Sequence, residues 1–67
     1  MKKSDIIMDA LKHRRRNETL EKAIGKAVRR SGGSFEYYIE IMSCIREKRR
    51  AKKLTLLDAA RKVADGD

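Results

Sequence analysis

The longest regular pattern in the sequence is an alternation of apolar and basic positions between residues 5 and 30. One set of positions recurs at steps of three and four, which places its members along one side of a helix. These positions are Ile6, Ala10, His13, Asn17, Leu20, Ile24 and Ala27, flanked by Ile7, Leu11 and Val28. Basic residues occupy the opposite side. The pattern predicts an amphipathic helix with one buried side and one solvated, cationic side.

Whether this helix is continuous depends on residues 14–19. Asn17 or Thr19 could cap a second helix, and the run from Arg14 to Arg16 offers no apolar side chain. The apolar spacing is nevertheless kept across the interval. We therefore expect one helix over residues 5–30, which would be about 39 Å long.

A break follows at Ser31-Gly32-Gly33-Ser34, where glycine can adopt the left-handed conformation that ends a helix and Ser34 can cap the next one. A second helix is predicted to begin at Phe35, run antiparallel to the first and end near Lys52. Its apolar stripe consists of Phe35, Tyr38, Ile39, Met42 and Ile45. Its remaining face carries Glu36, Glu40 and Glu47, which we expect to pair with basic side chains of the first helix or of another subunit.

Leu54 and Thr55 mark a further turn, after which a short third helix is predicted to end near Gly66. The expected fold is therefore an all-α small helical bundle in which residues 1–67 form a single domain. Two long helices and one short helix would make only a single apolar layer. Pairing two copies would close a four-helix core, so we expect a homodimer.

The formal net charge is +8 and the isoelectric point is about 10.1, which favours an anionic partner. The charge is uneven, because residues 1–31 hold ten Lys or Arg against four Asp or Glu. A row of cations along a helix can neutralise successive phosphates of a nucleic acid. The predicted nucleic-acid-binding residues are Lys12, Arg14, Arg15, Arg16, Lys22, Lys26, Arg29, Arg30, Arg46, Arg49, Arg50, Lys52 and Lys53.

Within this set, Lys12, Arg15 and Arg16 would lie in one helical turn and contact adjacent phosphates together. The only aromatic residues are Phe35, Tyr37 and Tyr38, so stacking of unpaired bases is not expected and a duplex is the favoured target. The hypothesis is a non-catalytic nucleic-acid-binding protein of low sequence specificity. The alternatives are an interaction subunit that docks an acidic protein and, with less support, peripheral binding to anionic lipid.

Part of the second half resembles a known DNA-binding family. Ile45, Arg49, Leu54-Thr55, Ala60 and Ala64 are similar in spacing and type to the first two helices of the lambda-repressor-like helix-turn-helix family. The resemblance implies a leucine-threonine turn followed by a helix with a small residue at the inter-helix contact. Lys48 stands where that family usually buries an apolar residue, and no recognition helix follows within this sequence. We therefore do not expect sequence-specific readout through such a helix.

Three weaker patterns concern other chemistry. Backbone N–H groups of residues 31–34 could bind phosphate, although an ordinary break between helices is the favoured interpretation. His13 and Asn17 interrupt the apolar side, and three interpretations are open: a buried polar pair, an exposed gap or a functional polar site. Ser43 and Cys44 lack a neighbouring general base, and one histidine with one cysteine is too few for a metal site, so we expect no enzymatic activity, metal or cofactor.

The single cysteine, Cys44, excludes a disulfide within the chain and fits a reducing compartment. No apolar run approaches the ~20 residues of a membrane-spanning helix. We expect a cytoplasmic protein.

Overall fold

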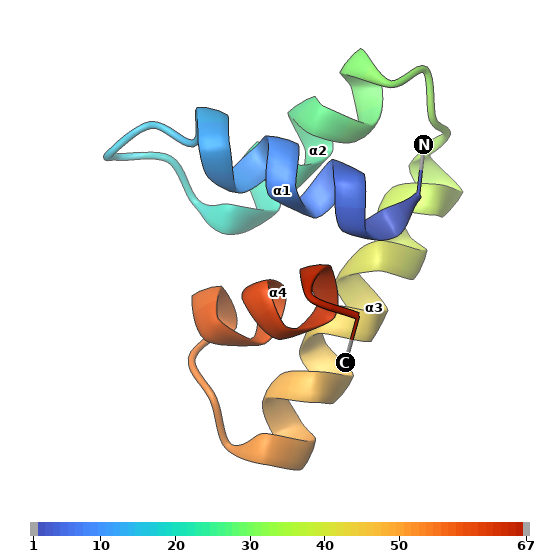
Figure 1. Cartoon of the computed structure of the whole chain (residues 1–67). Coiled ribbons are helices and arrows are strands. Elements are labelled where there is room, and N and C mark those ends of the chain that lie inside the picture. Colours follow the sequence, from blue (N-terminus) through green and yellow to red (C-terminus); the bar gives the residue numbers. More distant parts are fainter. Residues whose placement is uncertain (1, 67) are drawn as a thin grey trace.

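The computed structural model describes residues 2–66 of the chain, and every regular element among them is a helix. The helices are α1 (Lys3–His13), α2 (Leu20–Arg30), α3 (Phe35–Lys52) and α4 (Leu56–Ala64). The all-α prediction is confirmed. Each helix packs mainly on two others: α1 contacts α2 and α4, and α3 contacts the same two helices (Figure 1). The four helices thus surround one core.

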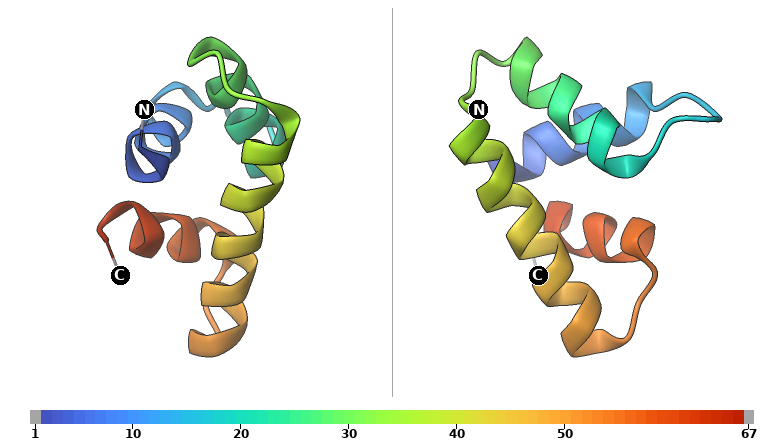
Figure 2. Two further views of the ribbon diagram at one scale, coloured as in Figure 1. Left: turned by 90° about the vertical axis from the view of Figure 1, so that its right-hand side faces the viewer. Right: turned by 180° about the vertical axis from the view of Figure 1, so that it is seen from behind.

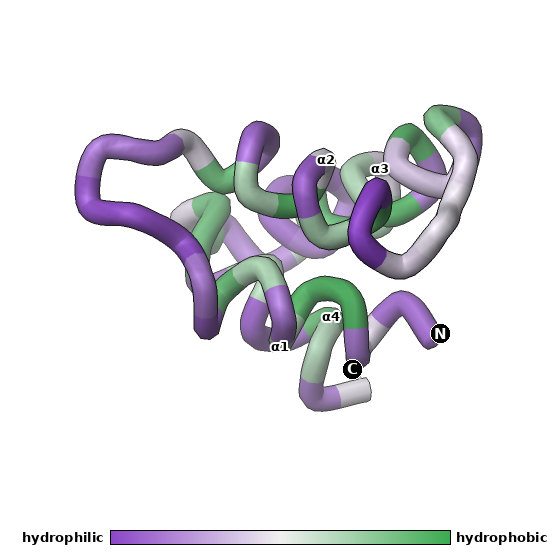
Figure 3. The backbone as a smooth tube through the Cα atoms, turned by 90° about the horizontal axis from the view of Figure 1, so that it is seen from above, coloured by the Kyte–Doolittle hydropathy of each residue, from purple (hydrophilic) through white to green (hydrophobic). Residues whose placement is uncertain are grey.

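The expected single helix over residues 5–30 is wrong, because residues 14–19 form a loop and α2 doubles back beside α1. Thr19 is the N-cap of α2, and its hydroxyl accepts a hydrogen bond from the backbone N–H of Lys22 at 3.2 Å. A continuous helix of about 39 Å would exceed the longest dimension of the molecule, which is 30 Å. The polar segment between His13 and Thr19 forms the connection, because it has no apolar surface to bury (Figure 3).

The core draws its apolar side chains from all four helices. Its fully buried large residues are Ile6, Ile7, Ile24, Ile41, Met42 and Ile45. His13 and Asn17, which share the predicted apolar side, are both exposed, so they form no buried polar pair. Ala59 and Ala60 let α4 approach the core closely and complete it. One chain therefore closes a four-helix core, and the single-layer argument for a homodimer does not apply; the homodimer itself stays a prediction.

Helix α3 begins at Phe35 and ends at Lys52, but its first turns are more exposed than the stripe predicts. Phe35 retains 72% of its surface and Ile39 retains 48%, whereas Tyr37 and Tyr38 pack partly against the core. Only one side of the first two turns of α3 is therefore covered. The Ser34 hydroxyl caps this helix by accepting from the N–H of Tyr37 at 3.2 Å.

The far end of α3 projects past α4, which is visible in all three side views (Figures 1 and 2). No residue of α3 after Ile45 is buried. None of the helices formed by residues 2–66 has the length and apolar character that a membrane span requires.

Candidate nucleic-acid interface

The thirteen cations predicted to bind nucleic acid are all exposed, but they do not form one stripe. Lys12 lies in the last turn of α1, and Arg14, Arg15 and Arg16 lie in the loop before α2. Lys22, Lys26, Arg29 and Arg30 lie on α2, and the other five lie at the C-terminal end of α3. The loop protrudes on one side of the molecule, well away from the end of α3 (Figures 1 and 2). The cationic stripe expected along one helix is therefore divided between the end of α1, the loop and α2, and the cluster at the end of α3 lies apart from it.

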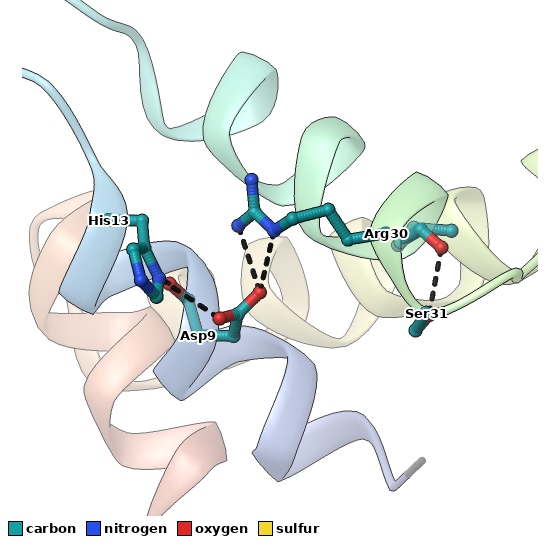
Figure 4. A network of polar contacts seen from close by, with 5 residues as sticks. Asp9, His13, Arg30 and Ser31 are labelled. Carbon is teal, nitrogen blue, oxygen red and sulfur yellow. Dashed lines mark hydrogen bonds and ion pairs between the residues drawn. The ribbon is translucent and has the colours of Figure 1, made fainter.

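Three of these cations are engaged with the protein itself. Arg30 donates from Nε and Nη2 to the same oxygen of Asp9, at 3.1 and 2.8 Å (Figure 4). Lys26 forms an ion pair with Glu18, and Arg14 Nε donates to the carbonyl oxygen of Glu18 at 3.1 Å. These contacts join α1, the loop and α2, so their first role is to hold the helical hairpin together.

Asp9 is the centre of the contacts between α1 and α2. Besides Arg30, it meets His13, whose Nδ1 lies 3.0 Å from the second carboxylate oxygen (Figure 4). The hydrogen bond from Arg30 is the main reason that the pKa of Asp9 is lowered, and the charge of Arg30 and the approach of His13 lower it further. Lys26 likewise lowers the pKa of Glu18 through its hydrogen bond. Both carboxylates are held in their charged form.

One acidic residue of α3 has the partner that the sequence predicts. Lys3 of α1 lies 2.9 Å from Glu40, and this hydrogen bond raises the pKa of Lys3. Glu36 and Glu47 make no ion pair within residues 2–66.

The most concentrated group of unpaired cations lies at the C-terminal end of α3. Arg46, Arg49, Arg50 and Lys53 follow the spacing i, i+3, i+4 and i+7, so they share one face of the helix. Together with Leu54 they line an open hollow of about 510 Å³. None of the four pairs with a carboxylate in the described part of the chain. We call this surface the α3 cationic face.

Lys53 has an unusual backbone conformation for a lysine. It ends α3 with φ of 53° and ψ of 45°, in the left-handed region, and its N–H donates to the carbonyl of Arg49. Glycine is the residue that normally adopts this conformation at a helix end, and another residue there loses about 1 to 2 kcal/mol. The sequence gives no sign of this strain, because the apolar pattern is the same whichever conformation Lys53 adopts. A charged side chain thus occupies a position where glycine would be more stable.

The break between α2 and α3 uses three of the backbone N–H groups considered for phosphate binding to cap α2. The N–H groups of Ser31, Gly32 and Gly33 all donate to carbonyl groups at the end of α2, at 2.9 to 3.1 Å. Gly32 has a φ of 79° and makes the left-handed turn. These three residues cap α2, and their N–H groups are already used within the chain.

A second hollow lies between α2 and the start of α3. It measures about 580 Å³, and its lining includes Lys22, Gly25, Arg29, Phe35 and Tyr38. The periodic pattern places Phe35 and Tyr38 in the apolar stripe and indicates no role for Gly25. One feature of the sequence does point to the exposure of Phe35. It is the first residue of its helix, and a side chain at that position rarely has neighbours on all sides.

No group of three or more potential metal ligands occurs within residues 2–66. Comparisons with protein-family models, with curated proteins and with solved structures gave no significant match.

Proposed function

We propose that this protein is a small, non-catalytic nucleic-acid-binding protein that holds the phosphate backbone with the α3 cationic face. The observation that carries the proposal is the gathering of four unpaired cations on one face of a projecting helix end. Arg46, Arg49, Arg50 and Lys53 gain no carboxylate partner from folding. An external anion is the natural counterpart of such a surface.

The helix dipole explains only part of this arrangement. Cations in the last turn of a helix are favourable, typically by 0.3 to 1 kcal/mol each. Arg46, however, lies before that turn, and its spacing to Arg49 and Arg50 places like charges side by side. Such pairs destabilise a helix by roughly 0.2 to 0.5 kcal/mol each. The strained Lys53 adds to this loss. A bound polyanion would offset both the repulsion between these cations and the strain at Lys53.

A duplex backbone fits the dimensions of the α3 cationic face. Arg46 and Lys53 are seven residues apart, which corresponds to about 10 Å along a helix. One strand of a duplex carries about three phosphates over that length of its axis. The guanidinium groups of arginine suit phosphate because they donate two parallel hydrogen bonds. Contacts of this kind carry no base information, so sequence specificity should be low.

The test is to titrate isotopically labelled protein with a short duplex and to follow its backbone amide NMR signals. We expect the largest shifts between residues 46 and 54, with smaller shifts in the loop of residues 14–19. The shifts should fade as salt is added, because counterions compete for the phosphates. Uniform small shifts over all exposed cations would show attraction by net charge alone and would contradict a defined face. Parallel titrations with duplex DNA and duplex RNA would identify the preferred backbone.

A further inference from the structure

The hollow between α2 and the start of α3, here called the α2/α3 groove, is built differently from the α3 cationic face. We propose that the groove docks an acidic, amphipathic helix of a partner protein. This inference goes beyond the proposed nucleic-acid binding and does not depend on it, because the two surfaces use different residues. Three features of the groove support it: its floor, its aromatic wall and its charged rim.

The floor of the groove is formed at Gly25, in the middle of α2. A Cβ atom at this position would lie 3.7 Å from Tyr38 Cε1, which is an ordinary van der Waals contact. Neither the backbone nor a clash therefore requires glycine here. Glycine inside a helix is about 0.5 to 1 kcal/mol less stable than alanine. The fold tolerates this loss, and the result is a deeper groove.

The wall of the groove is an aromatic pair made of the exposed Phe35 and the half-buried Tyr38. Phe35 stacks on Tyr38 with ring centroids 5.8 Å apart and an interplanar angle of 23°, which fixes its orientation. Phe35 nevertheless keeps 72% of its surface, and Ile39 lies one helical turn further with 48% exposed. A large, rigid and uncovered aromatic side chain is typical of an anchor residue in a protein interface.

The rim of the groove carries both signs of charge. Lys22 and Arg29 are seven residues apart on α2, so they lie on the same side, and neither pairs with a carboxylate among residues 2–66. Glu21 also lines the groove. A phosphate chain would meet repulsion at Glu21, whereas a peptide can place a neutral or basic side chain there. The chemistry therefore favours a polypeptide over a nucleic acid.

The geometry specifies the partner's pattern. Lys22 and Arg29 are separated by about 10 Å along α2, which matches two carboxylates two turns apart on a neighbouring helix. Apolar side chains between those carboxylates, at helical spacing, would cover Phe35 and fill the space above Gly25. The same partner helix must therefore carry both the two carboxylates and the apolar side chains between them.

The experiment is a selection of displayed random helical peptides against the full chain, followed by amide NMR mapping of the best binder. We expect selected peptides to combine Glu or Asp with apolar residues at helical spacing, and to shift the signals of Lys22, Gly25, Arg29 and Phe35. Phe35→Ser should weaken binding of the selected peptide roughly tenfold, as is common for an anchor residue. Because Phe35 is mostly exposed, the variant should remain folded.

Two further variants separate charge from shape. Lys22→Glu/Arg29→Glu should weaken the same peptide more than tenfold, and a peptide with its acids changed to Lys should restore binding. Arg49→Glu/Arg50→Glu changes the net charge equally at the other end of the molecule and should leave peptide binding unchanged while weakening duplex binding. Gly25→Ala should stabilise the fold yet reduce peptide affinity, because its methyl group occupies the groove.

Several results would overturn the proposal. Selected peptides that lack acidic residues, the absence of any binder, or shifts that map outside the groove would each do so. Equal loss of peptide binding in the two charge-reversed variants would show attraction by net charge alone. Saturable binding of a single-stranded oligonucleotide at Phe35, or self-association through this groove, would assign the surface to a different occupant.

Discussion

At the scale of single residues, Lys53 connects stability with the proposed function. Its left-handed backbone is unfavourable for a lysine, while its side chain lies on the α3 cationic face. Lys53→Gly should therefore stabilise the protein by about 1 kcal/mol, because glycine adopts this conformation without strain. The same change should weaken binding to a duplex and lower the magnitude of the log K versus log salt slope by up to roughly 0.9. Urea unfolding and fluorescence anisotropy would measure the two effects.

The neighbouring lysine provides a matched control. Lys52 is the last residue of α3 in its helical conformation, so Lys52→Gly removes the same charge but should destabilise the helix. If both glycine variants changed stability in the same direction, the left-handed strain at Lys53 would not be present in solution.

Asp9 gives a prediction about pH at the same scale. Its pKa lies below the ordinary value of 3.8, mainly because Arg30 donates to its charged form. A lowered pKa contributes stability that is present above the unfolded-state value and is lost as the pH falls through the folded-state value. Asp9→Asn should thus cost about 0.5 to 1 kcal/mol near neutral pH, as expected for a partly exposed ion pair.

The difference in stability between wild type and Asp9→Asn should shrink towards zero as the pH is lowered below the folded-state pKa. Denaturant unfolding at a series of pH values would measure it. Glu47→Gln is the control, because Glu47 is exposed and has no ion pair in the described chain. A constant difference across the acid range would mean that the ionised carboxylate of Asp9 does not support the hairpin.

At the scale of elements, the division between α1 and α2 depends on Thr19. Thr19→Ala removes the hydroxyl that caps α2 and should destabilise the protein by about 1 kcal/mol. The sign of this change is diagnostic. If residues 5–30 formed one helix, Thr19 would lie in its interior, and alanine would be neutral or stabilising there because of its higher helix propensity. Thermal unfolding of the two proteins would distinguish the cases.

The helices themselves follow from the sequence more readily than their connections. Ile6, Leu20 and Ile24 are buried where the periodic pattern places them. The pattern could not locate the turn at residues 14–19, because a helical phase can be kept by chance across a short loop. His13 and Asn17 were the informative positions. Two polar residues in succession on an apolar side are better explained by exposure at the end of a helix than by burial.

The candidate site was only partly predictable, for a related reason. The exposed state of the thirteen cations follows from their charge, but their grouping depends on the path of the chain. A single helix would have aligned Lys12 with Arg15 and Arg16. In the structure α1 ends at His13, so Arg15 and Arg16 lie in the loop and do not share a helix with Lys12. The periodic pattern likewise placed Phe35 in the apolar stripe, and only its position as the first residue of its helix pointed to exposure.

At the scale of the whole molecule, the two surfaces have different designs. The α3 cationic face is a projecting helix end with four cations, whereas the α2/α3 groove combines an aromatic wall with a mixed-charge rim. If both proposals hold, the protein would join a nucleic acid to a partner protein. The homodimer expected from the sequence is a separate prediction, and light scattering over a range of concentrations would decide it.

Duplex binding by two triple variants, measured at several salt concentrations, tests whether the α3 cationic face holds the phosphate backbone. Arg46→Ala/Arg49→Ala/Arg50→Ala removes three charges from the α3 cationic face, and Lys12→Ala/Arg15→Ala/Arg16→Ala removes three from the end of α1 and the loop that follows it. With folding verified by circular dichroism, the first variant should lower the magnitude of the log K versus log salt slope by ~2 to 3, and the second by less than ~1. Equal reductions would show that binding follows net charge and does not depend on the α3 cationic face.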